Sequence, residues 1–130
     1  MYMRLLTLLL LTLPIILTSC AKEKSSVEII QDKEIDLQMI DAYQEGMKAL
    51  EEQDGLTAAK KFSEAELLFP QSKWAPRASL MAAYSYYSNE YYSDTLYELE
   101  RFFKTYPNHP RTDYAYYLLA ITYYDKIVDE

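Results

Sequence analysis

The sequence contains few of the residues that most catalytic and metal-binding sites require. Its 130 residues include one Cys, one His and two Gly. A single Cys cannot form an intramolecular disulfide, and a single imidazole gives no His pair for a metal ion. The two Gly are far apart and form no Gly-rich phosphate-binding loop. We therefore expect a protein that is not an enzyme and that has no metal or other noncovalent cofactor.

The remaining ionisable residues form no recognisable catalytic group either. His109 lies in a Pro-containing segment, so we expect a turn residue that hydrogen-bonds to the neighbouring backbone. Carboxylates close in sequence, such as Glu64 and Glu66, are expected on a solvated helix face.

Basic residues are scarce relative to acidic ones. The 13 Lys and Arg stand against 20 Asp and Glu, which gives a formal net charge of −7 at pH 7. Nucleic-acid binding requires a basic patch or stripe, and anionic lipid head groups attract only basic surfaces. We expect neither kind of binding from the side chains.

Charge is absent from the N-terminal segment between Leu5 and Leu17, a run of 13 residues that follows Arg4. A membrane-spanning helix needs about 20 apolar residues, so this run is too short. A basic start and a short apolar run are typical of a secretory signal peptide. We assign residues 1–19 to it.

The run ends in Leu17-Thr18-Ser19-Cys20, which resembles the lipobox of bacterial lipoproteins. The resemblance implies cleavage before Cys20 and acylation of Cys20, and stable anchoring takes two or more lipid signals. Ala21 is not the Asp that retains many lipoproteins in the inner membrane. We therefore expect a lipid anchor on the periplasmic face of the outer membrane. The mixed-sign charges of residues 21–34 indicate a flexible tether, so residues 20–35 are assigned to the lipidated Cys and tether.

An internal repeat organises the rest of the chain. Phe69-Pro70 recurs 37 residues later as Tyr106-Pro107, and Gly46 aligns with later Ala residues at the same offset. Apolar residues recur at helical spacing between Pro-containing or polar breaks. The pattern predicts helices over residues 36–53, 56–68, 75–88, 91–105 and 111–127.

These units resemble tetratricopeptide repeats, which are helical hairpins of about 34 residues. The resemblance implies an all-α, tetratricopeptide-like solenoid over residues 36–130. The first repeat covers residues 36–70, the second covers 74–107, and the first helix of a third covers 111–130. Small residues in such repeats lie where the two helices of a hairpin cross. We therefore expect Gly46 at a helix crossing rather than in a turn.

The repeat register also predicts which tyrosines are buried and which are available for binding, among 14 in the chain. Tyr86, Tyr116 and Tyr123 are expected to pack between helices. Exposed aromatic surface often marks an interaction site. Alternatively, the tyrosines cover the inside of a narrow superhelix or pack against later repeats. The predicted peptide-binding groove contains Tyr43, Arg77, Tyr84, Tyr87, Tyr114, Tyr117 and Tyr124.

A more specific resemblance rests on Trp74-Ala75-Pro76-Arg77 and above all on the segment 106–114, Tyr-Pro-Asn-His-Pro-Arg-Thr-Asp-Tyr. With the lipobox and tether, these segments resemble the BamD (ComL) family of lipoproteins. The resemblance implies partners among the subunits that assemble outer-membrane β-barrels, and N-terminal repeats that receive unfolded outer-membrane proteins. From its place in the predicted groove, Arg77 is expected either to pair with the terminal carboxylate of a bound segment or to be an ordinary solvent-facing Arg.

Two other functions remain open on the sequence alone. The chain could be another repeat-bearing lipoprotein, such as a pilotin of a pilus secretin. It could also be the solenoid part of a cell-wall enzyme.

Overall fold

A computed structural model describes residues 26–129, with side chains described for residues 34–128. The chain divides into two units, Met1–Ile30 and Gln31–Glu130. In the first unit only the start of a helix is described. The signal peptide and Cys20 lie outside the described residues.

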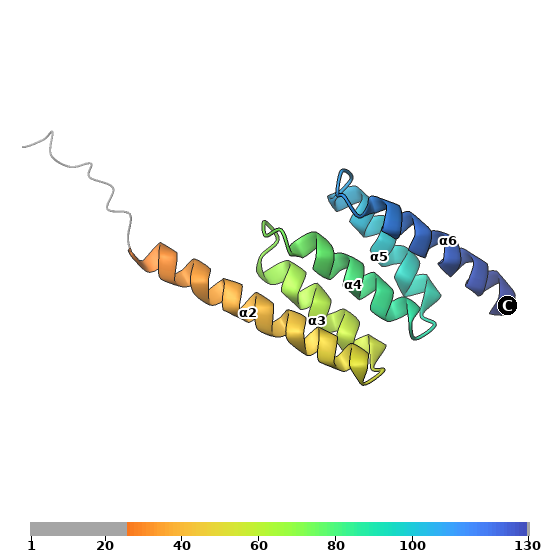
Figure 1. Ribbon diagram of the computed structural model, residues 1–130, viewed down its shortest axis with the longest axis horizontal. Helices are drawn as coiled ribbons and strands as arrows, with labels where there is room; N and C mark the ends of the chain where they lie inside the picture. The colour runs from red at the N-terminus through yellow and green to blue at the C-terminus, as the bar shows by residue number, and fades with distance from the viewer. Residues whose placement is uncertain (1–25, 130) are drawn as a thin grey trace, which may run out of the picture. The chain divides into compact units, whose positions relative to one another are not determined.

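The described residues are all-helical and contain no strand, as the sequence predicted. Successive helices run antiparallel to one another, joined by short connections (Figure 1). The five helices are α2 (Ser26–Glu51), α3 (Gly55–Leu68), α4 (Ala75–Tyr87), α5 (Tyr92–Thr105) and α6 (Thr112–Asp129).

The start of α2 corrects the prediction of a flexible segment up to residue 35, because the helix already begins at Ser26. Neither Gly nor Pro occurs between Ser26 and Glu45. Extending an existing helix fixes one residue for each new hydrogen bond, so it costs far less than nucleating one. Polar composition alone therefore did not end the helix.

The turns within the two hairpins repeat at the same offset as the sequence. Gln53 and Glu90 stand 37 residues apart, and they adopt left-handed backbone conformations with φ of 62° and 64°. The next helix begins directly after the first of these turns. There the Asp54 carboxylate accepts a hydrogen bond of 3.0 Å from the Thr57 N–H, which lowers the pKa of Asp54.

The connections between hairpins contain the aromatic-Pro pairs. The α3 helix ends at Leu68, directly before Phe69-Pro70, because Pro disfavours helical backbone in the residue before it. In the second connection, the His109 ring nitrogen Nδ1 accepts a hydrogen bond of 3.3 Å from the Arg111 N–H. His109 is thus the turn residue that the sequence predicted.

Gly46 lies where α2 crosses α3, which confirms the prediction from the repeat register. A Cβ atom at this position would stand 3.0 Å from two ring carbons of Phe62. Ala83 holds the corresponding place in α4 and packs with Leu99 and Phe102 of α5. A missing or one-carbon side chain lets each pair of helices approach closely.

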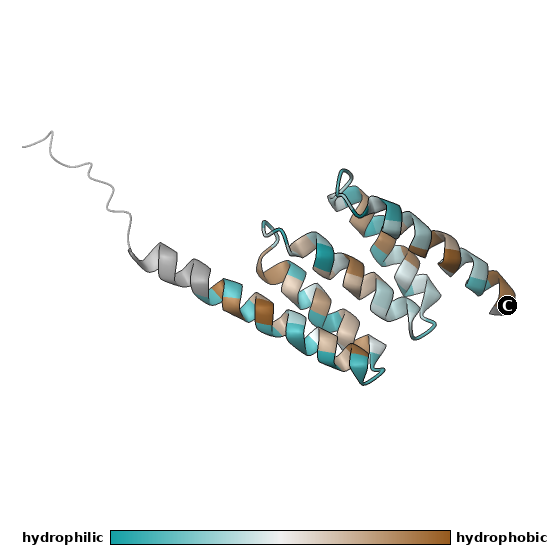
Figure 2. Cartoon of the chain, in the orientation of Figure 1, coloured by the Kyte–Doolittle hydropathy of each residue, from teal (hydrophilic) through white to brown (hydrophobic). Residues whose placement is uncertain are grey.

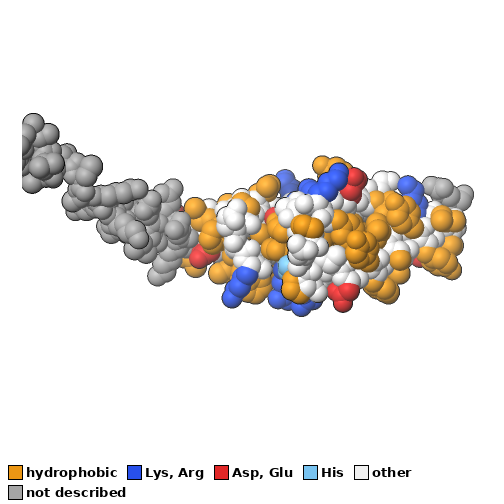
Figure 3. All heavy atoms as spheres, turned by 90° about the horizontal axis from the view of Figure 1, so that it is seen from above, with side chains coloured by type: hydrophobic (Ala, Val, Ile, Leu, Met, Phe, Trp, Pro, Cys, Tyr) orange, Lys and Arg blue, Asp and Glu red, His pale blue; other side chains and the backbone are white. Residues whose placement is uncertain are grey.

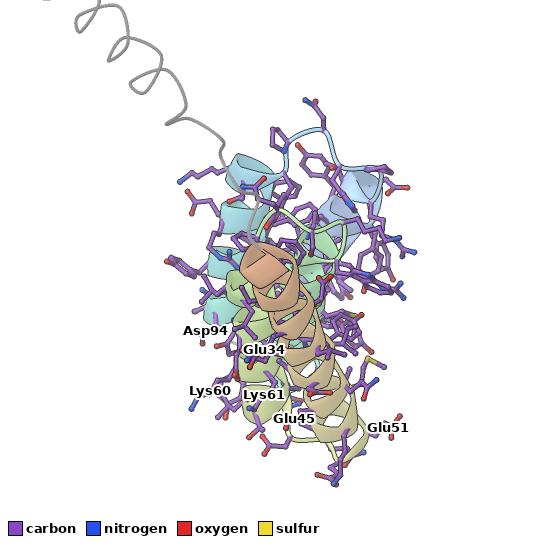
Figure 4. All side chains as sticks on the ribbon, turned by 90° about the vertical axis from the view of Figure 1, so that its left-hand side faces the viewer. Glu34, Glu45, Glu51, Lys60, Lys61 and Asp94 are labelled. Carbon is purple, nitrogen blue, oxygen red and sulfur yellow. The ribbon has the colours of Figure 1, made fainter. Side chains whose placement is uncertain are left out.

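The core continues from one hairpin to the next. Phe62, Leu99, Phe102 and Leu118 are fully buried. Hydropathy alternates along the helices, and the C-terminal half of α6 carries several strongly hydrophobic positions (Figure 2). On the surface, the Lys61 ammonium of α3 lies 2.7 Å from the Glu45 carboxylate of α2, a contact that joins the first hairpin (Figure 4).

A buried ion pair joins α3 to α5. The two terminal guanidinium nitrogens of Arg101, Nη1 and Nη2, donate to the two carboxylate oxygens of Glu66 at 2.8 and 2.6 Å. The Tyr106 hydroxyl donates to the same carboxylate at 2.8 Å, and Glu98 and Ser79 accept further bonds from Arg101. Hydrogen bonding to Glu66 raises the pKa of Arg101, so the guanidinium stays charged.

The prediction of a solvated face for Glu64 and Glu66 is therefore wrong for Glu66, which is 3% exposed. Glu64 is exposed, as predicted. Spacing within α3 gave no sign of the difference, because the partner of Glu66 lies 35 residues away.

Candidate peptide-binding face

Four tyrosines of α4 and α6 gather on one face, which we call the tyrosine face: Tyr84, Tyr87, Tyr114 and Tyr117. The rings of Tyr114 and Tyr117 are 6.4 Å apart between centroids. Burial raises the pKa of Tyr114, and the nearby phenols of Tyr84 and Tyr117 raise it further. The phenol of Tyr117 likewise raises the pKa of Tyr87. The helices thus bring together four residues that the sequence assigned to one groove.

Burial differs across the tyrosine face. Tyr84 and Tyr87 are half-buried and pack against the core, whereas Tyr114 and Tyr117 are 38% and 61% exposed. The inner rings are fixed by packing, and the outer rings present apolar area together with a hydroxyl. Tyrosines placed in this way can contact both the side chains and the backbone of a bound segment.

Tyr87 is held by a bond that sequence reasoning did not find. Its hydroxyl donates to the Asp125 carboxylate of α6 at 2.7 Å. This hydrogen bond and burial raise the pKa of Tyr87 to about 12. The acceptor lies 38 residues away. The bond fixes α6 against α4 and sets the orientation of the ring.

The hydrogen bond makes a pH dependence testable. The folded-state pKa of Tyr87 lies above its ordinary value of 10.0. Its contribution to stability is therefore complete below pH 10 and is lost as the pH rises toward 12. We expect Tyr87→Phe to be less stable than the parent at pH 8 and to lose less stability between pH 10 and 12, in urea titrations.

The exposed Tyr97→Phe is the matched control, and its stability should follow the parent at every pH. Parallel stability curves for Tyr87→Phe and the parent would contradict a phenol bonded to Asp125.

A hollow of about 450 Å³ adjoins the tyrosine face where α2 and α4 end. Tyr84 lines it together with Leu50, Gln53 and the polar side chains of Ser88 and Asn89. The hollow therefore extends the face from α6 and α4 toward α2.

Tyr43 and Arg77 form a separate part of the predicted groove, around Trp74. The Tyr43 ring packs edge-on against both Phe62 and Trp74, at 5.1 and 5.9 Å between centroids. The Arg77 guanidinium carbon lies 5.3 Å from the centre of the Trp74 ring. A pocket of about 260 Å³ is lined by Met39, Ile40, Tyr43, Gln44 and Trp74. Trp74 was not among the predicted site residues, although it precedes Arg77 by three positions.

Tyr124 lies on the same side of α6 as Tyr117, seven residues and about two turns further along the helix. It is 69% exposed. The predicted groove residues thus fall into the tyrosine face, the Trp74 pocket with Arg77, and Tyr124 as an exposed extension.

Two of the three tyrosines expected to pack between helices are largely exposed. Tyr86 is half-buried and contacts Tyr91, but Tyr116 and Tyr123 are 59% and 52% exposed. Tyr116 stacks on Phe103 of α5 at 4.4 Å, so only one side of its ring is covered. The α6 helix packs against α5 and α4, and the exposure of Tyr116 and Tyr123 marks a side of α6 that these two helices do not cover.

The part of the chain that the structure describes has neither a candidate membrane-spanning helix nor a metal-binding group of side chains. None of its helices is long and apolar enough to cross a membrane. No group of three or more His, Cys, Asp or Glu side chains within it could hold a metal ion.

Comparison with known proteins gives one family. The model of the family YfiO, described as an outer membrane lipoprotein, matches residues 35–130. A protein of Caulobacter vibrioides named outer membrane protein assembly factor BamD is 32% identical over 111 residues, covering 85% of this chain and 35% of the relative. Proteins of the same name from Neisseria gonorrhoeae and Rickettsia prowazekii are 30% and 31% identical over 122 and 120 residues.

Each of these last two alignments covers 92% of this chain, and 44% or 45% of the relative. The chain therefore spans less than half the length of these curated relatives. The family model nevertheless covers nearly all the described residues, including the tyrosine face and the buried ion pair. This chain belongs to the YfiO family of outer membrane lipoproteins, the family of its BamD relatives.

Proposed function

We propose that this chain is a lipid-anchored assembly factor for outer-membrane proteins. Its tyrosine face holds extended, aromatic-bearing segments of unfolded outer-membrane proteins on the periplasmic side, and its partners are the other subunits of a β-barrel assembly machine. The function is binding rather than catalysis. The names of the relatives support the assembly role, and the convergence of four tyrosines on one face supports the site.

The substrate class follows from the chemistry of the face. Transmembrane β-strands alternate apolar and polar residues and carry aromatic girdles, so an extended strand offers rings at two-residue spacing. Edge-to-face contacts between aromatic rings contribute about 0.5–1.5 kcal/mol each beyond the area they bury. Several such contacts give capture without tight retention, which suits a factor that must release its substrate. We propose a C-terminal strand as the bound segment, with its terminal carboxylate reaching beyond the tyrosine face to Arg77 beside Trp74.

Tyr117 and Tyr116 allow a matched test of the tyrosine face. They are neighbours on α6 with almost equal exposure, 61% and 59%, but only Tyr117 belongs to the face. We expect Tyr117→Ala to weaken binding of a peptide from the C-terminal strand of an outer-membrane protein by about tenfold, which corresponds to about 1.4 kcal/mol. Tyr116→Ala should bind as the parent does, in fluorescence anisotropy titrations.

The far-UV circular dichroism of both variants should match that of the parent, because both side chains are exposed. Equal peptide affinity for the two variants would remove the tyrosine face as the site, and weaker binding only in Tyr116→Ala would place the site on the side of α6 that carries Tyr116.

The anchor is tested separately, at Cys20. This residue follows an uncharged apolar run and two small residues, the arrangement expected before a lipidated Cys. We expect Cys20→Ala to leave an uncleaved precursor that takes up no labelled palmitate and no longer fractionates with the outer membrane. Ser19→Ala keeps a small residue before the cleavage site and should be processed normally. Palmitate labelling that persists in Cys20→Ala would contradict the anchor.

A further inference from the structure

The hollow of about 450 Å³ beside the tyrosine face, which we call the amide hollow, is built by two hairpins. The connections that join α2 to α3 and α4 to α5 lie at the same end of the helices (Figure 1). Leu50 and Gln53 line the hollow from the first hairpin, and Tyr84, Ser88 and Asn89 line it from the second. Two of these side chains, Gln53 and Asn89, carry primary amides, which both donate and accept hydrogen bonds.

The Asn89 side chain lies directly against the backbone of Gly55, the first residue of α3. A Cβ atom on Gly55 would overlap the Asn89 amide nitrogen and the carbonyl oxygen of Ser85. Only a residue without a side chain allows the two hairpins to approach so closely here. The first hairpin therefore holds in place an amide that the second hairpin carries.

A chain of hydrogen bonds sets which atom of the Asn89 amide can accept. The Ser88 hydroxyl donates to the Ser85 carbonyl oxygen at 3.0 Å, so its single proton is already used. The hydroxyl oxygen accepts a bond of 3.3 Å from Asn89 Nδ2. Neither the Asn89 Oδ1 atom nor the Gln53 amide has a hydrogen-bond partner among the residues that the structure describes. The hollow thus offers one acceptor and one whole amide to a ligand.

The amide hollow belongs to one joint of the solenoid and is not a general feature of its repeat. At the offset of 37 residues, Tyr92 stands in place of Gly55, and Lys126 stands in place of Asn89. The Tyr92 ring packs against Tyr87, with 6.3 Å between centroids. The repeat fold therefore does not require a bare backbone with an amide against it, which favours a role in binding.

The amides supply what the tyrosine face lacks. Hydrophobic side chains, tyrosine rings among them, gather near the end of α6 in the face that Figure 3 shows. A phenol covers side chains and offers one hydroxyl, so it leaves most main-chain N–H and C=O groups of a bound segment without a partner, at a cost in affinity. Tyr84 belongs both to the tyrosine face and to the wall of the hollow. A segment that continues past Tyr84 reaches the two amides.

We propose that the amide hollow holds the main chain of the bound segment. A main-chain N–H donates to Asn89 Oδ1, and a main-chain carbonyl oxygen accepts from the Gln53 amide. Each residue of an extended chain offers one donor and one acceptor, and primary amides match both. Main-chain groups are the same in almost every sequence, so this part of the site selects an extended conformation rather than particular side chains. The inference rests on the proposed function, which supplies an extended polypeptide as the ligand.

The test is an ester scan of the outer-membrane-protein peptide that probes the tyrosine face. In each peptide of the series one main-chain N–H is replaced by oxygen, so that a donor is lost while every side chain is kept. The net contribution of one hydrogen bond corresponds to about two- to tenfold in affinity. We expect at least one ester to weaken binding to the full chain by about that factor, in anisotropy titrations.

Asn89→Ala and Asn108→Ala are the paired variants of the full chain, since Asn108 is an exposed amide in the connection between α5 and α6. Asn89→Ala should bind the all-amide peptide about two- to tenfold more weakly than the parent does, and the sensitive ester should then cost nothing further. This coupling reports a direct bond, which a role in folding alone would not produce. Asn108→Ala should respond to the ester as the parent does. Gln53→Ala leaves the contact with Gly55 intact and should also weaken the all-amide peptide.

Two results would overturn the proposal. The first is an ester scan in which no position weakens binding to the parent. The second is an ester effect that persists unchanged in Asn89→Ala, which would place the main chain elsewhere. Peptide binding that Tyr117→Ala weakens and Asn89→Ala does not would retain the tyrosine face and reject the amide hollow. Binding that neither variant weakens would reject the proposed peptide site together with the hollow.

Discussion

Among the charged residues that the structure describes, Arg101 is the one whose replacement by Ala is expected to destabilise the protein most. Glu66 is 3% exposed. After the substitution, the Tyr106 hydroxyl is the hydrogen-bond donor that remains for the Glu66 carboxylate. Removing one partner of a buried ion pair costs about 3–5 kcal/mol, because the other charge stays buried without compensation. That is a large share of the roughly 5–15 kcal/mol that stabilises a domain. Thermal unfolding should show a fall of roughly 15 °C.

The matched control is Lys104→Ala, one turn further along α5. The Lys104 ammonium lies 2.8 Å from Glu100, but both side chains are exposed, so the melting temperature should hardly change. The double variant Glu66→Leu/Arg101→Leu should be more stable than Arg101→Ala, since it buries no unpaired charge. Equal melting temperatures for Arg101→Ala and Lys104→Ala would show that Glu66 is not held by Arg101.

The positions of the helices were predictable because local signals define them. The helices α3 and α5 end two residues before Pro70 and Pro107, and Asp54 caps the start of α3. Gly46 marks a close crossing because a Cβ atom there would already stand 3.0 Å from the Phe62 ring. The start of α2 was missed because its charged composition indicated a tether, although residues 26–35 contain neither Gly nor Pro to stop a helix.

The contacts between distant residues were not predictable in the same way. Whether Glu66 faces water or Arg101 depends on how α5 lies against α3, and whether Tyr87 meets Asp125 depends on how α6 lies against α4. Neither pair has a sequence spacing that a single helix or turn would set. The register assigned Tyr84, Tyr87, Tyr114 and Tyr117 to one groove, and these four lie near one another in the structure. It could not show that Tyr43 turns toward Trp74.

The same reasoning explains the wrong assignment of Tyr116 and Tyr123. In the earlier repeats the corresponding positions are packed. Ser79 and Ala42, which stand 37 and 74 residues before Tyr116, are both buried. Burial needs a second surface as well as the right position in a helix. In the described part of the chain that surface is present for α2 and α4 and missing for α6.

Gly46→Leu is expected to have the largest effect among the apolar substitutions, since Gly46 lies between two helices of the first hairpin. A Cβ atom alone would stand 3.0 Å from the Phe62 ring carbons, which is too close for free accommodation. Leu adds three more carbons in the same direction. Overpacking of this kind typically costs about 1–3 kcal/mol, and we expect the upper end because Phe62 is fully buried.

A graded series separates overpacking from helix propensity. Replacing a mid-helix Gly by Ala stabilises a helix by about 1 kcal/mol, so Gly46→Ala should be nearly neutral, with that gain offsetting the contact with Phe62. Met47→Leu, at the exposed next position, should also be nearly neutral. Combining Gly46→Leu with Phe62→Leu should cost less than the sum of the single changes, because the smaller side chain makes room. Urea titrations in which Gly46→Leu raises the unfolding midpoint would mean that α2 and α3 do not cross at this residue.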